Sequence, residues 1–144
     1  MTVSKNDLLQ EIQSKLELKD ELFLGMSKRN YYLPSLNELK LINNFYQNNF
    51  INHYKIKTSN KWNCLAFAES YKVIANLYHS QFIDSSAASI AVGNAFYKEN
   101  QRGHVASLVI YAENDKFNLN FLDFLGNFKF LKPQEIKSIE LIIF

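Results

Sequence analysis

Three residues in this 144-residue chain have the types and order needed for nucleophilic catalysis. Cys64 stands where helical spacing begins, directly after residues that favour turns and helix caps. A helix N-terminus and a nearby imidazolium both favour the thiolate form of a cysteine. His104 opens a strand-like segment and Asp123 closes the next, so an antiparallel pair would bring the carboxylate to the histidine ring. The pattern predicts Cys64 as nucleophile, His104 as base and Asp123 as the group that orients it.

Residues around the cysteine extend this predicted site. The backbone N–H of Cys64 is a donor for an oxyanion, and the side-chain amide of Asn60 or Asn63 is a candidate second donor. Trp62 is a candidate wall of a substrate groove. Gly103 carries no side chain that would crowd the histidine after it.

Each of these residues also has a purely structural interpretation. A single cysteine on an apolar helix face is usually a small buried hydrophobic residue. His104 fits a strand edge at which its ring bonds a backbone carbonyl, and Asp123 fits the opening of a turn. Trp62 fits packing against the start of the helix. Both interpretations stay open on sequence grounds.

The first half of the chain predicts helices. Apolar residues at steps of three and four predict an amphipathic helix from Lys5 to Phe23. Ser35 and Glu38 have capping-box spacing, so a second helix begins there and ends near Asn48 or Asn49. A third helix begins at Cys64 and reaches Tyr78, with a loop or edge strand over residues 50–58 before it.

The second half predicts strands. β-branched and aromatic residues alternate with polar ones, and the polar run from Glu113 to Lys116 suits a hairpin turn. A second reversal is expected at Gly126 and Asn127. The order of helices first and strands second predicts an α+β fold in which three to five antiparallel strands pack on the cysteine-bearing helix. The predicted strands cover residues 89–97, 104–112, 117–124 and 138–144.

Composition narrows the class of protein. A length of 144 residues, of which 47% are hydrophobic, suits one compact domain over 1–144. The net charge is +2. No apolar run is long enough for a membrane span, and the lysines form no stripe suited to nucleic acid. The lone cysteine favours a reducing cytoplasm. His53 and His79 have no metal-ligand spacing, so no metal or cofactor is expected.

The motifs resemble those of the papain-like cysteine peptidase superfamily. The residues that carry the resemblance are the runs 62–68 (WNCLAFA), 103–106 (GHVA), 121–123 (FLD) and 31–35 (YYLPS). They are most similar to the papain-like domain of a fungal chimeric lectin and its bacterial and phage relatives. The resemblance implies a papain-like core over about residues 30–144, with residues 1–24 peripheral. Asn63, Leu65 and Ala66 replace acids of those relatives, and Phe124 and Leu125 replace Pro-Gln.

The function expected from these residues is that of a cysteine hydrolase. Cys64 would attack an amide carbonyl of a peptide or protein, and His104 would transfer the proton to the leaving amine. Peptidase, amidase, deamidase and transferase outcomes all stay open. The alternative is a non-catalytic papain-like scaffold that binds a peptide or protein. A third interpretation is a small interaction protein whose first helix docks on a larger assembly.

Overall fold

The computed structural model describes residues 1–16, 23–25, 28, 30–83, 88–123, 129–131, 136 and 138–144. The helices are α1 (Lys5–Leu16), α2 (Leu36–Tyr46) and α3 (Cys64–Tyr78), and the π-helical turns η1 (Gln47–Asn52) and η2 (His79–Ile83) continue α2 and α3. The strands are β1 (Thr2–Ser4), β2 (Phe23–Gly25), β3 (Asn30–Tyr32), β4 (Ser89–Ile90), β5 (Val92–Glu99), β6 (Arg102–Glu113), β7 (Lys116–Asp123), β8 (Lys129–Leu131) and β9 (Ile139–Ile143). The fold is α+β, as the order of sequence patterns predicted.

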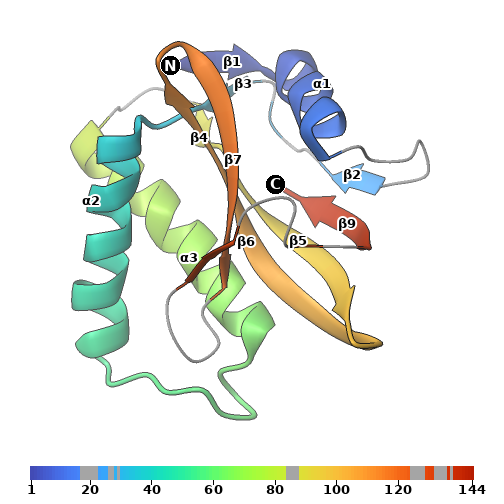
Figure 1. The fold of residues 1–144 in the computed structure, drawn as a ribbon. Helices are drawn as coiled ribbons and strands as arrows, with labels where there is room; N and C mark the ends of the chain where they lie inside the picture. Colours follow the sequence, from blue (N-terminus) through green and yellow to red (C-terminus); the bar gives the residue numbers. More distant parts are fainter. Residues whose placement is uncertain are drawn as a thin grey trace.

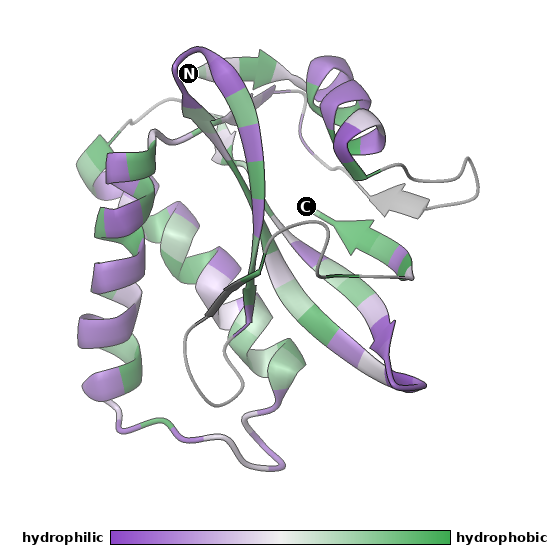
Figure 2. Cartoon of the chain, viewed as in Figure 1, coloured by the Kyte–Doolittle hydropathy of each residue, from purple (hydrophilic) through white to green (hydrophobic). Residues whose placement is uncertain are grey.

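The strands form two sheets (Figure 1). The larger has six strands in the order β2-β9-β5-β6-β7-β8, and all of its pairs are antiparallel except β2 with β9. The smaller has the order β1-β3-β4. Figure 2 shows alternating hydrophobic and hydrophilic residues along β7, the period that predicted this strand. The long pairs of β6 with β5 and β7 make the centre of the large sheet.

Helices cover both faces of the large sheet. On one face, Ile12 of α1 packs in a buried cluster with Phe121 of β7. On the other face, Tyr71 of α3 packs in a second cluster with Val109 of β6. Figure 1 shows α1 on one side of the sheet and α2 and α3 on the other. His104 and Asp123 therefore lie on a sheet held between two helical layers, and Cys64 lies at the start of α3.

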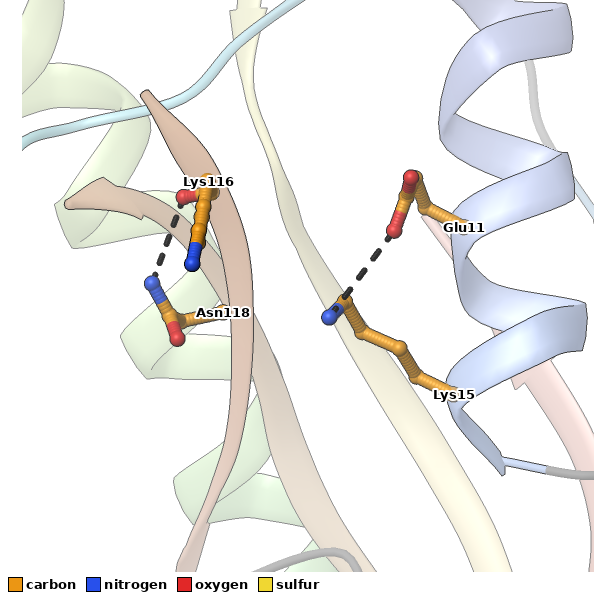
Figure 3. A network of polar contacts seen from close by, with 4 residues as sticks. All are labelled: Glu11, Lys15, Lys116 and Asn118. Carbon is orange, nitrogen blue, oxygen red and sulfur yellow. Dashed lines mark hydrogen bonds and ion pairs between the residues drawn. The ribbon is translucent and has the colours of Figure 1, made fainter. Parts of the chain in front are cut away.

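Helix α1 lies close to strand β7 (Figure 3). Its exposed side carries an ion pair of Glu11 with Lys15, with Nζ 3.9 Å from Oε2, which is an i,i+4 pair worth a few tenths of a kcal/mol. Facing it, the Asn118 side chain donates to the Lys116 carbonyl at 3.2 Å. The apolar side of α1, with Leu8 and Ile12 fully buried, holds the helix on the sheet.

The capping box predicted for α2 is confirmed. The Glu38 backbone N–H donates to Ser35 Oγ at 3.2 Å, and the Ser35 N–H donates to Glu38 Oε2 at 2.6 Å. The Tyr32 hydroxyl donates to the other oxygen of this carboxylate at 3.0 Å. Burial raises the pKa of Glu38, but these hydrogen bonds outweigh it and leave the pKa below its usual value. The box fixes the residue at which α2 begins.

We expect Ser35→Ala to lower the free energy of unfolding by about 1 kcal/mol, because it removes the acceptor for one helical N–H. Chemical denaturation measures the loss. Ser35→Thr, which keeps a capping oxygen, should recover most of it. Equal stability of the wild type and the alanine variant would show that the box contributes nothing.

The β6–β7 hairpin also follows its sequence signal. Asn114 and Asp115 both have positive φ, at 52° and 58°, and Glu113 pairs with Lys116 across the turn. Two-residue hairpin turns need this left-handed backbone, which asparagine and aspartate tolerate better than most residues. The polar run thus marks a tight turn, as expected.

Three structural expectations need correction. The first helix ends at Leu16, and Phe23 lies in β2, where its backbone pairs with β9 instead of continuing a helix. The large sheet has six strands instead of the three to five expected. The sequence did not reveal β2 and β8 because they are too short to show an alternating pattern. Residues 50–52 belong to a π-helical turn and not to a strand. The reversal expected at Gly126 and Asn127 lies outside the described residues.

Candidate functional site

The structure brings two of the predicted residues, His104 and Asp123, into contact and places Tyr97 against the histidine ring. His104 Nε2 lies 3.2 Å from Asp123 Oδ2, and their side chains are 10% and 20% exposed. The ring of His104 meets Tyr97 edge-on, with centroids 5.1 Å apart. Cys64 is partly exposed and is the first residue of α3. That these residues form a site stays a prediction.

Strand pairing explains this arrangement. Tyr97 of β5 is directly opposite His104 of β6, so their side chains share one face of the sheet. Strands β6 and β7 are antiparallel with Ser107 opposite Leu122, which brings His104 and Asp123 to the same end of the pair. The β5–β6 and β6–β7 hairpins therefore position all three side chains.

Tyr97 is the member that sequence reasoning missed. Burial raises the pKa of its hydroxyl, and the charges of Asp123, Glu99 and Cys64 raise it further. The phenol consequently stays protonated at neutral pH. A hairpin prediction between the strands that end at Tyr97 and begin at His104 would have found the pair.

The two asparagines occupy different positions. Asn63 is the N-cap of α3, where its Oδ1 accepts the Ala66 N–H at 3.1 Å. Its side-chain oxygen is thus engaged in starting the helix that carries Cys64. Asn60 is exposed in the preceding loop. Among the described residues, no hydrogen bond joins either amide to His104.

Trp62 packs and lines a cavity at the same time. Its ring lies 5.6 Å from that of Phe67 in α3 and 5.7 Å from that of Phe50 in η1. It forms one wall of an open cavity of about 610 Å³. We call this cavity the aromatic groove; it is lined by Phe45, Asn49, Phe50, Tyr54, Ile56, Trp62, Ile74 and Leu77.

A second, polar recess adjoins His104. It has a volume of about 570 Å³ and lies at the β5–β6 turn, lined by Glu99, Asn100, Arg102, Gly103 and His104. Asn100 and Gln101 have φ angles of 51° and 66°, so two residues other than glycine hold the left-handed backbone of this turn. No atom within 4 Å would meet a Cβ at Gly103, which leaves the approach to the histidine open.

The sequence indicated Trp62 as a groove wall, but it did not indicate the other residues that line the aromatic groove. Its walls come from α2, η1, the loop after η1 and α3, and residues 50–58 gave no clear periodic signal. The available signal was density of aromatic residues between Phe45 and Trp62, read together with the polar residues that separate them. Such density also occurs in ordinary cores, so only the fold shows that part of it is open.

Two further observations concern the described residues alone. Within these ranges, no group of three or more His, Cys, Asp or Glu is placed to hold a metal ion. No helix in the described part of the chain is long and apolar enough to cross a membrane.

Comparison with known proteins gives structural matches only. No family model matches the chain, and no curated protein matches it. A structure described as "PSL1a-E64 complex" matches with a TM-score of 0.77 and 12% identity, over 99% of this chain and 51% of that chain. The Polyporus squamosus lectin bound to the human-type influenza-binding epitope Neu5Acα2-6Galβ1-4GlcNAc matches with a TM-score of 0.75 and 12% identity, over 99% and 49%.

These matches show that the chain shares its fold with about half the length of that lectin chain. They correct the assignment to the papain-like cysteine peptidases. No family model supports that assignment. One matching structure is described as a lectin with a bound epitope, and neither is described as a peptidase. Three expectations depended on that assignment and are not retained: the cysteine hydrolase function, the catalytic triad and the peptide or protein substrate. The contact of His104 with Asp123 is a structural fact that stands independently.

Proposed function

We propose that the chain is a non-catalytic binding module whose aromatic groove holds a segment of another protein or a peptide. The observation that carries the proposal is the groove itself, an open cavity of about 610 Å³ with four aromatic rings in its walls. Cavities of about 300–1,000 Å³ are the usual size of ligand sites. The fold shared with a lectin supports a binding role over a hydrolytic one.

The exposure of the groove residues supports a partner. Tyr54 is 66% exposed and Leu77 is 44% exposed, although both are large and apolar enough to favour burial. Trp62 and Tyr54 are residue types that dominate binding energy at interfaces. A segment that filled the groove would remove this apolar surface from water, which is the main driving force of association.

The proposal is tested by binding to apolar helical peptides, read from the fluorescence of Trp62, the single tryptophan of the chain. Tyr54→Ala should weaken binding about tenfold, because it removes an exposed anchor. Leu41→Ala is the matched control, since Leu41 is 52% exposed and does not line the groove. No change in Trp62 emission with any peptide would overturn the proposal.

The proposal that the module is non-catalytic is tested separately, by the rate at which iodoacetamide alkylates Cys64. A binding module needs no thiolate, so we expect no enhanced reactivity at neutral pH relative to denatured protein, and the same rate in His104→Ala. Rapid alkylation well below pH 8 that disappears in His104→Ala would demonstrate a thiolate–imidazolium pair. That result would overturn the non-catalytic proposal.

The cytoplasmic location stays a prediction.

A glycan is a second candidate ligand, because one matching structure contains the lectin bound to a sialylated epitope. The polar recess offers groups suited to a sugar acid: the Arg102 guanidinium for a carboxylate, and Glu99 and Asn100 for hydroxyls. Titration with Neu5Acα2-6Galβ1-4GlcNAc should then show binding that Arg102→Gln removes. Absence of binding by the wild type would exclude this ligand.

A further inference from the structure

We infer that the partner of the aromatic groove is an acidic protein segment, one whose apolar side chains fill the groove while its carboxylates meet lysines on the rim. The inference rests on the proposed binding function and adds the charge of the partner. Residues 39–68 contain four lysines and no aspartate or glutamate. This span supplies six of the eight residues that line the groove, and it carries more positive charge than the whole chain, whose net charge is +2.

Three of these lysines lie next in sequence to residues that line the groove. Lys55, Lys57 and Lys61 are each a chain neighbour of a groove-lining residue, and all three are exposed. None of them forms an ion pair with another described residue. Unpaired charges of one sign around an apolar cavity favour a partner of the opposite sign and raise its association rate.

The chemistry of the walls favours a protein segment over a single-stranded nucleic acid. Nucleic-acid sites offer open aromatic faces on which bases stack. Here the ring of Phe50 is already stacked on Tyr46 and meets Tyr54 and Trp62 edge-on. Three other lining residues, Ile56, Ile74 and Leu77, are aliphatic, and such walls suit leucine or phenylalanine side chains of an amphipathic helix.

Three peptides of equal length test the inference. They share one leucine and phenylalanine face, and their other positions are all Glu, all Gln or all Lys. Trp62 emission should show the Glu peptide binding tightest at low ionic strength, with its advantage reduced by added salt. Charge reversal at Lys55, Lys57 and Lys61 to Glu should weaken the Glu peptide about tenfold or more and reverse the order of the peptides.

Matched variants keep the result interpretable. Lys116→Glu, at the start of β7 and outside the groove lining, should leave all affinities unchanged. If the triple reversal fails to fold, replacing the same lysines with Gln removes the positive charge without adding negative charge. Equal binding of all three peptides would overturn the charge inference and leave the groove function intact.

Two other outcomes would overturn the inference differently. No response to any peptide would remove the proposed function together with the inference. A response of Trp62 to oligothymidylate, or to vesicles of phosphatidylserine and phosphatidylcholine, that exceeds the response to the Glu peptide would assign the rim lysines to a nucleic acid or to a membrane surface.

Discussion

Deletion of residues 1–24 is expected to abolish cooperative folding. The deletion removes Leu8 and Ile12, which are fully buried in the cluster that also contains Phe121. Each such side chain stabilises the fold by about 1.5–3 kcal/mol. It also removes β1 and two residues of β2, and thereby one of the two strand partners of β3. Because small domains are stable by only about 5–15 kcal/mol, the combined loss should leave no cooperative thermal transition.

Point variants separate packing from chain length. Ile12→Ala alone should cost about 2–5 kcal/mol, whereas Gln13→Ala, on the exposed side of the same helix, should cost almost nothing. Circular dichroism during heating measures both. A deleted protein that melts cooperatively near the wild-type temperature would contradict this prediction, and would support the interpretation in which the first helix is a peripheral docking element. A single domain over residues 1–144 is our proposal.

Local sequence signals predicted those parts of the fold that local interactions determine. The capping box at Ser35 and the start of α3 at Cys64 lie where cap residues placed them. The turn at Asn114 and Asp115 follows from backbone preferences of two residues. By contrast, β2 forms because Phe23 pairs with Leu141, far along the chain, and nothing near Phe23 encodes that contact.

The candidate site was predictable in part for the same reason. Strand order placed His104 beside Asp123, since each residue lies at an end of a recognisable strand. Tyr97 required the register of a hairpin, and the aromatic groove required the relative position of α2 and α3. A family resemblance carried by short motifs supplied a function that the comparisons then corrected. Motifs identified the residues that come together, but they did not determine what the surface binds.

The free energy of unfolding is expected to fall steeply above pH 10. Burial raises the pKa of Tyr46 to about 12, although the hydrogen bond to Ser70 lowers it somewhat. Burial also raises the pKa of Tyr71, and ionised Tyr46 would raise it further. The pKa of Tyr97 is raised for the reasons given above. Tyr71 is fully buried and donates to the Asn43 side chain, so its ionisation in the folded state is strongly disfavoured.

The direction of this pH dependence follows from the number of protons that the folded and unfolded states bind. In the unfolded chain these phenols ionise near pH 10, whereas the folded protein holds their protons to higher pH. The stabilisation that each buried phenol contributes is therefore fully present below pH 10. It is lost as the pH rises above 10, and for Tyr46 this loss continues to about pH 12. At about 1.4 kcal/mol per pH unit for each residue, the three together should cost about 4 kcal/mol at pH 11.

Two single substitutions identify which tyrosines are responsible. Tyr46→Phe should reduce the loss between pH 9 and pH 11 by about 1.4 kcal/mol, because the shifted phenol of Tyr46 is gone. Tyr54→Phe should leave it unchanged, since Tyr54 is 66% exposed. Chemical denaturation at each pH gives the free energies, and tyrosinate absorbance shows whether the phenols ionise only on unfolding. Ionisation of all tyrosines in the folded protein near pH 10, with constant stability, would contradict the burial of these hydroxyls as the cause.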